Sequence, residues 1–149
     1  MLSIRSANEL HRNSIQKCFM SLFDASEYEH MNKIEDLSHS HVGLDRHGEV
    51  KAFAIVKPSN KYAAFEIAYL GISTRYQRKG YAKLLIKLTL HNLQSNVWLN
   101  TLDTNIQACK LYESIGFVLF DTIPYDKESN THIYVYYHHD MPYLDQWAF

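Results

Sequence analysis

QRKGYAKLLIKLTLHNL, residues 77–93, joins a loop with two cations and a glycine to the most regular helical pattern of the chain. Apolar side chains recur three and four positions apart from Ala82 onward, as on one face of an amphipathic helix. The first N–H groups of a helix lack partners within it, and the helix dipole makes that end positive. The loop therefore predicts an anion cradle, with charge from Arg78 and Lys79 and open backbone at Gly80. A solvated turn would have the same composition.

Positive charge is concentrated around this loop. The whole chain holds 15 Lys and Arg against 16 Asp and Glu, for a formal net charge of −1. Residues 75–87 contain five basic side chains and no acid: Arg75, Arg78, Lys79, Lys83 and Lys87. One focused anion site is therefore expected rather than a generally basic surface for nucleic acid.

Length and composition predict a single soluble domain over residues 1–149. The chain is 46% hydrophobic and 21% charged, with no repeat or low-complexity linker. No apolar run approaches the roughly 20 residues of a membrane-spanning helix, and no signal peptide opens the chain, so a cytoplasmic location is expected. Cys18 and Cys109 lack C-x-x-C spacing, and both are expected to be reduced.

The first half of the chain predicts a strand, two helices and three strands. LSIRSA (2–7) reads as a strand, ANELHRNSIQKCFMSLF (7–23) as a helix capped by Asn8 or Ser6, and SEYEHMNKIEDL (26–37) as a polar helix. HVGLD and VKAFAIVK form a hairpin around RHGE, and YAAFEIAYLGIS (62–73) is a long strand. Gly71 inside that strand indicates a bulge, or the close approach of another backbone or of a ligand.

The second half predicts a helix, strand, helix and two strands. KGYAKLLIKLTLHNL (79–93) is the first helix, VWLNTL (97–102) a buried strand, and NIQACKLYESIG a helix capped by Asn105 and ended by Gly116. FVLFD (117–121) and HIYVYYHH (132–139) complete the sheet. Hairpins in the first half and right-handed crossovers in the second imply a mixed α/β sheet.

Two motifs in this order resemble the GNAT superfamily of N-acetyltransferases. Its acetyl-CoA loop reads Gln/Arg-x-x-Gly-x-Gly/Ala, which Gln77, Gly80 and Ala82 match. Its next helix reads Asn-x-x-Ala-x-x-Leu-Tyr-x-x-x-Gly-Phe, matched by Asn105, Ala108, Leu111, Tyr112, Gly116 and Phe117. The resemblance covers residues 41–121. It implies a GNAT-like fold, with a mostly antiparallel sheet of about seven strands splayed in the middle and about four flanking helices.

The resemblance also implies a cofactor site for acetyl-CoA. Backbone amides of the loop would hold the pyrophosphate, and those residues are Gln77, Arg78, Lys79, Gly80, Tyr81 and Ala82. Leu70, Gly71 and Ile72 would pair with the pantetheine arm beside the splay. Asn105 would contact the arm from the other side, with Ala108 in the same motif, although a plain helix cap would also explain Asn105.

Two residues are expected to carry the chemistry of direct acetyl transfer to a primary amine. By the resemblance, Tyr112 protonates or hydrogen-bonds the leaving thiolate, whereas a packing role beside Gly116 is the alternative. Glu66 is the only acid in an otherwise apolar strand, where burial would raise its pKa and make it a general base. The histone acetyltransferase branch has a glutamate at this place. The alternatives are a solvent-facing glutamate and proton removal by ordered water.

The acceptor is expected to be a small-molecule amine or the lysine or N-terminal amine of a protein. Five acids, Asp24, Glu27, Glu29, Glu35 and Asp36, would attract a cationic amine or simply form a solvated helix face. Tyr134, Tyr136 and the tail at 141–149 would line an acceptor pocket or pack in the sheet, and a homodimer is a further expectation.

Other functions fit the sequence less well. His39 and His41 share a strand face without a third ligand, and His138 and His139 point to opposite faces, so no metal site is predicted. A basic helix that binds nucleic acid or membrane would leave the second motif unexplained. The remaining alternative to an enzyme is a regulatory module that binds CoA without turnover.

Overall fold

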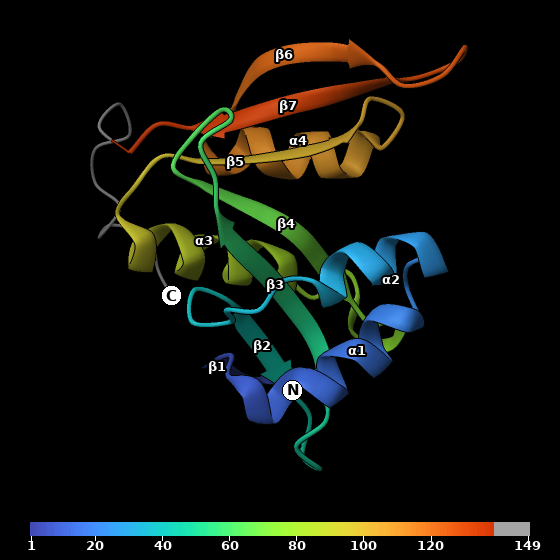
Figure 1. Cartoon of the computed structure of the whole chain (residues 1–149), viewed down its shortest axis with the longest axis vertical. Helices are drawn as coiled ribbons and strands as arrows, with labels where there is room; N and C mark the ends of the chain where they lie inside the picture. The colour runs from blue at the N-terminus through green and yellow to red at the C-terminus, as the bar shows by residue number, and fades with distance from the viewer. Residues whose placement is uncertain (139–149) are drawn as a thin grey trace. The chain divides into compact units, whose positions relative to one another are not determined.

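The computed structural model of the chain describes residues 1–138, which contain seven strands, four α-helices and two short 3₁₀ helices (Figure 1). The hydrogen-bonded strand order is β1-β2-β3-β4-β5-β7-β6. Contacts divide these residues into two compact units. The first comprises Met1–Lys57 and Ile67–Leu93, and the second comprises Pro58–Glu66 and residues 94–138.

The first unit has helices on both faces of its strands. It contains β1 (Ser3–Ser6), η1 (Glu9–His11), α1 (Arg12–Met20), α2 (Ala25–Asn32), β2 (His41–Leu44), β3 (Val50–Pro58), most of β4 (Phe65–Ile72), η2 (Thr74–Tyr76) and α3 (Tyr81–Leu93). Antiparallel pairing joins β1 to β2 and β2 to β3. Phe53 of β3 packs with Phe19 of α1, whereas Ala52 and Ala54 pack with Leu85 of α3. This alternation follows from successive strand side chains pointing to opposite faces.

The second unit places one helix against a three-stranded antiparallel sheet. It contains β5 (Val97–Leu102), α4 (Ile106–Ile115), β6 (Val118–Pro124) and β7 (Asn130–Tyr136), with β7 between the other two strands. Tyr112 of α4 and Phe117 contact Tyr134 and Tyr136 on one face, with ring centroids 5.9 and 5.6 Å apart. A cluster around Trp98 covers the other face. The register pairs Phe65–Val97 and Glu66–Trp98 join β4 to β5 in parallel.

The predicted mixed sheet is confirmed, because β4 pairs with β5 in parallel, whereas β1–β2, β2–β3, β5–β7 and β6–β7 pair antiparallel. The order of helices and strands along the chain is also as predicted. The predicted splay in the middle of the sheet stays a prediction. The single domain over residues 1–149 also stays a prediction. None of the helices in residues 1–138 is long and apolar enough to cross a membrane. No group of three metal-ligating side chains occurs in that part of the chain.

Element boundaries differ from the prediction where side chains cap or redirect the backbone. The first predicted helix begins as η1, since Asn8 accepts a hydrogen bond from the Leu10 N–H at 2.8 Å and the Asn8 N–H donates to the His11 ring. The strand expected from residue 62 begins at Phe65, because a turn closed by the Ser59 N–H and the Ala64 carbonyl precedes it. By contrast, β5 has the predicted bounds.

A buried histidine connects β2 to α3 in the first unit. His41 is 5% exposed, and its Nε2 lies 2.9 Å from Asn92 Nδ2. An amide nitrogen only donates, so Nε2 accepts and the proton of the neutral ring is on Nδ1. Nδ1 lies 3.5 Å from Thr89 Oγ1, and that hydroxyl donates to the Leu85 carbonyl at 2.8 Å. The network requires a neutral imidazole, and burial lowers the pKa of His41.

The free energy of unfolding is therefore expected to fall on acidification below about pH 6.5, the ordinary pKa of histidine. Because the folded state has the lower pKa, the unfolded state binds more protons in this window, and stability rises with pH until the unfolded histidine is neutral. The slope is at most about 1.4 kcal/mol per pH unit for one proton. Urea unfolding from pH 5 to 7.5 should give a shallower profile for His41→Gln than for the wild type. Parallel profiles would contradict this role.

Candidate functional site

The loop ahead of α3 has left-handed backbone at two positions. Arg78 and Gly80 adopt positive φ, at 61° and 87°. A non-glycine residue such as Arg78 rarely occupies this region. Gln77, directly ahead of Arg78, is extended, at φ −69° and ψ 157°. Since α3 begins at Tyr81, the N–H groups of its first turn point out of the helix start.

A side-chain contact that the sequence did not indicate holds this loop to β4. Gln77 Nε2 donates to the Ile72 carbonyl at 2.9 Å, which ties the start of the loop to the last residue of the strand. The sequence predicted only a backbone contribution from Gln77. The bond brings together the two predicted cofactor segments of the first unit, residues 70–72 and 77–82.

Tyr81 uses its side chain for packing. Its hydroxyl accepts a hydrogen bond from the Leu2 N–H at 2.9 Å, and its ring contacts Tyr76 with centroids 6.4 Å apart. The contribution of Tyr81 to anion binding that the sequence predicts is that of its backbone N–H. A Cβ at Gly80 would meet no atom within 4 Å, so the glycine is required by its positive φ and leaves exposed backbone on this side of the loop.

Gly71 has a packing reason within the first unit. A Cβ at this position would lie 2.5 and 2.8 Å from two ring atoms of Phe53 and 3.1 Å from a methyl group of Leu22. The prediction named a bulge, another backbone or a ligand, whereas the neighbours in the structure are an aromatic and an aliphatic side chain. Contact of the Gly71 backbone with a pantetheine arm stays a prediction.

In the second unit, Asn105 is confirmed as the cap of α4. Its Oδ1 accepts from the Ala108 N–H at 3.2 Å, and Gly116 ends the helix at φ 120°. The Asn105 side chain is exposed, and Ala108 is half-buried. A contact of either residue with the cofactor stays a prediction.

Tyr112 is held in an aromatic setting. It is 8% exposed and lies between Phe117 and Tyr134, whose ring centroids are 6.1 and 5.9 Å away. The Tyr134 hydroxyl donates to Glu113 Oε2 at 2.7 Å. Burial, with a smaller effect of the nearby Cys109, raises the pKa of Tyr112 to about 12. The phenol therefore remains protonated at neutral pH and can serve as a hydrogen-bond donor.

Glu66 and Tyr112 belong to opposite faces of the strands in the second unit. Directly paired residues place their side chains on the same face, so Glu66 shares a face with Trp98 and with Val135, the partner of Trp98 on β7. Tyr112 packs against Tyr134, which faces the other way. Glu66 is half-buried rather than fully enclosed.

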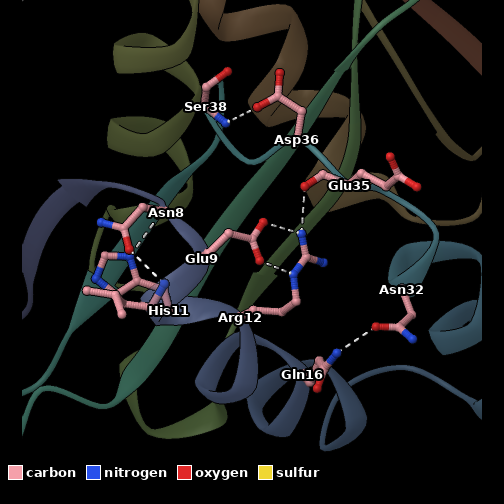
Figure 2. Close-up of polar contacts among 10 residues, drawn as sticks. Asn8, Glu9, His11, Arg12, Gln16, Asn32, Glu35, Asp36 and Ser38 are labelled. Atoms are coloured by element: carbon pink, nitrogen blue, oxygen red, sulfur yellow. Dashed lines mark hydrogen bonds and ion pairs between the residues drawn. The ribbon is translucent and has the colours of Figure 1, made fainter.

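Two of the five acids that were expected to attract a cationic amine, Asp24 and Asp36, form hydrogen bonds with the backbone. Asp24 caps α2 by accepting from the Glu27 N–H at 3.0 Å, and its hydrogen bonds, led by that from the Ser26 hydroxyl, lower the pKa of Asp24. Asp36 accepts from the Ser38 N–H at 2.9 Å, which likewise lowers the pKa of Asp36 (Figure 2). Both carboxylates remain ionised at neutral pH. Their attraction of a cationic amine stays a prediction.

Arg12 connects η1 with the segment that follows α2. Its guanidinium donates twice to the Glu9 carboxylate, at 2.7 Å each, and once to the Glu35 carbonyl at 2.8 Å (Figure 2). Gln16 of α1 donates to Asn32 at the end of α2 at 2.5 Å (Figure 2). These contacts connect η1, α1 and the segment after α2.

Tyr134 and Tyr136 are buried at 1% and 0% exposure, so the structure favours sheet packing over the walls of an acceptor pocket. The tail at 141–149 and His139 lie outside the described residues.

Solved structures share this fold over nearly the whole chain. The NatC complex bound to Gag peptide and CoA matches at 18% identity and a TM-score of 0.74, covering 91% of this chain and 98% of that chain. NAA60 from Arabidopsis thaliana, in complex with acetyl-CoA, matches at 17% identity and a TM-score of 0.71, covering 92% and 99%. The ribosomal-protein-S18-alanine N-acetyltransferase from Escherichia coli matches at 20% identity and a TM-score of 0.73, covering 91% and 92%. Comparison with curated proteins gives no match.

The fold is thus that of acetyltransferases, and sequence comparison identifies the family. The family model for the acetyltransferase (GNAT) family matches residues 8–117. This chain therefore belongs to the GNAT family of acetyltransferases. The match begins well before residue 41, where the resemblance carried by the two motifs began.

Proposed function

We propose that the protein transfers the acetyl group of acetyl-CoA to a primary amine by direct attack in a ternary complex. The observation that carries this proposal is the loop at residues 77–82, where exposed Gly80 and left-handed Arg78 precede the start of α3 in a chain of the GNAT family. The loop amides would bind the pyrophosphate, and Leu70, Gly71 and Ile72 would pair with the pantetheine. Asn105 and Ala108 would add further contacts with the cofactor.

Tyr112 would act on the sulfur of the leaving thiolate. A phenol with a pKa of about 12 is a weaker acid than a thiol of about 8.5, so complete proton transfer to the thiolate is uphill. Tyr112 would therefore stabilise the departing sulfur chiefly by donating a hydrogen bond, in the manner of an oxyanion-hole donor.

Glu66 would take the proton of the attacking amine, directly or through water. An amine attacks a thioester only when it is neutral, and a carboxylate near the nitrogen removes its proton. The base and the donor act on different atoms, nitrogen and sulfur. Both atoms are bonded to one carbonyl carbon during the attack, and Glu66 lies on the face of the strands opposite Tyr112, so Glu66 would reach the amine through water.

Binding and turnover together test the proposal. Acetyl-CoA and CoA should raise the melting temperature of the protein, whereas duplex DNA should not. Thiol release is then measured with a panel that contains peptides with free N-termini, lysine peptides, polyamines and amino acids. Stabilisation by acetyl-CoA without thiol release from any amine would favour the regulatory CoA-binding module instead. The cytoplasmic location and the homodimer are further proposals.

Replacing Glu66 by Gln is expected to lower kcat most near neutral pH. The loss should shrink at alkaline pH, because the amine then loses its proton without a base. The comparison is a kcat profile from pH 6.5 to 10, with Glu128→Gln, an exposed glutamate beyond β6, as the control that should follow the wild type. A loss of equal size at every pH would argue against Glu66 as the base.

A further inference from the structure

A pocket lies in the first unit, and none of its lining residues belongs to the loop at residues 77–82. It has a volume of about 170 Å³ and is bounded by α1, the start of β3 and the residue that follows β4. A single water needs roughly 10–15 Å³ of such space, so the pocket has room for a small polyatomic ion. Three serines, two lysines and a cysteine are among its lining residues: Ser14, Lys17, Cys18, Ser21, Lys51 and Ser73.

Hydrogen bonds between three elements hold the walls of the pocket. Ser14 Oγ accepts from the Val50 N–H at 2.8 Å, which joins α1 to β3. The Ser73 N–H donates to the Lys51 carbonyl at 2.8 Å, and Ser73 Oγ lies 3.5 Å from Cys18 Sγ. The pocket is therefore formed by the fold itself before any ligand binds.

The lining carries a net positive charge. Lys17 is exposed and takes part in no ion pair within residues 1–138. Lys51 Nζ lies 3.5 Å from Glu49 Oε2, longer than the 2.7–2.9 Å of a strong charge-assisted hydrogen bond. Glu49 is the only acid in the lining, which therefore contains two ammonium groups and one carboxylate.

The uncharged groups of the lining also suit an anion. Ser14 and Ser73 bring two hydroxyl groups, each able to donate one hydrogen bond, whereas the Ser21 hydroxyl already donates to the Cys18 carbonyl at 2.6 Å. Burial raises the pKa of the Cys18 thiol, so its sulfur is neutral and does not repel negative charge. The contact of Ser73 with that sulfur is weak and is readily exchanged for a bond to an oxyanion.

We propose that this pocket binds a small oxyanion, a free phosphate or a carboxylate, between Lys17, Lys51 and Ser73. The pocket shares no lining residue with the loop at residues 77–82, and the proposal does not depend on the proposed acetyl transfer.

Thermal unfolding of the full chain tests the site with inorganic phosphate and with acetate as probes. Each is added at 10 mM and compared with sodium chloride at the same ionic strength and pH. The melting temperature of the wild type should rise by about 3 °C with at least one oxyanion, the shift given by a ligand at about ten times its Kd. A response to phosphate alone identifies a phosphate site, and a response to acetate identifies a carboxylate site.

Variants locate the bound ion. The double variant Lys17→Gln, Lys51→Gln keeps most of both stems and should lose the shift, whereas Lys110→Gln, an exposed lysine on α4, should keep it. Gly80→Asp, which blocks the pyrophosphate loop, should also keep it. The proposal is overturned if neither oxyanion exceeds chloride, if the double variant keeps the shift, or if Gly80→Asp loses it. Acetyl-CoA binding by the double variant is measured separately and reports on the loop alone.

Discussion

Gly80→Asp is expected to abolish measurable binding of acetyl-CoA while the fold is retained. A carboxylate about 4 Å from a phosphate at a protein surface adds roughly 4 kcal/mol of repulsion at an effective dielectric constant of about 20. Each 1.4 kcal/mol is tenfold in Kd, so affinity should fall about 1000-fold. Isothermal titration calorimetry with acetyl-CoA measures this change.

Gly48→Asp is the matched control for this substitution. Gly48 is also exposed, has φ 77°, and a Cβ there would meet no atom within 4 Å. It lies in the turn between β2 and β3. Both variants therefore carry the same new charge and similar backbone strain, of the order of 1 kcal/mol. Equal acetyl-CoA affinity in the two variants would place the pyrophosphate elsewhere.

Tyr112→Phe is expected to lower kcat about 100-fold with little change in the Kd for acetyl-CoA. Removal of one donor that stabilises a developing negative charge typically costs 10²–10³ in kcat. Phenylalanine retains the ring that packs between Phe117 and Tyr134, so the fold should persist. Single-turnover kinetics at saturating acetyl-CoA separate this effect from binding.

Tyr125→Phe provides the comparison, since Tyr125 is 64% exposed and has no assigned role. It should turn over like the wild type. An unchanged kcat in Tyr112→Phe would leave Tyr112 as a packing residue alone. A weaker Kd at constant kcat would make it a binding residue instead of a donor to the thiolate.

The sequence around Gly71 does not identify which group of the protein lies against this residue. A glycine inside a strand indicates a bulge, or the close approach of another backbone or of a ligand. The neighbour that the structure shows is the Phe53 side chain, which belongs to another strand and is 18 positions earlier in the chain. The pattern around Gly71 contains no information about which side chain the fold brings there.

The buried tyrosines had the same ambiguity. Tyr134 and Tyr136 alternate on a late strand, and alternation alone does not say which face is covered. Their burial follows from α4, whose Tyr112 and the adjacent Phe117 lie against that face. The raised pKa of Tyr112 has the same origin, because desolvation depends on the neighbours that the whole unit assembles.

The sequence by itself determined the element order, the caps Asn105 and Gly116, and the family. It left Asn8 and Ser6 as alternative caps, of which the structure shows Asn8. These features depend on hydrogen bonds and side-chain periodicity within a few residues, or on the spacing of motifs. Each of these can be read from short stretches of the sequence. The tertiary structure alone decided where side chains go. Tyr81 bonds to Leu2 across 79 positions, and the oxyanion pocket combines three distant segments. Such contacts exist only once the chain has folded, because burial and long-range packing depend on every element at once.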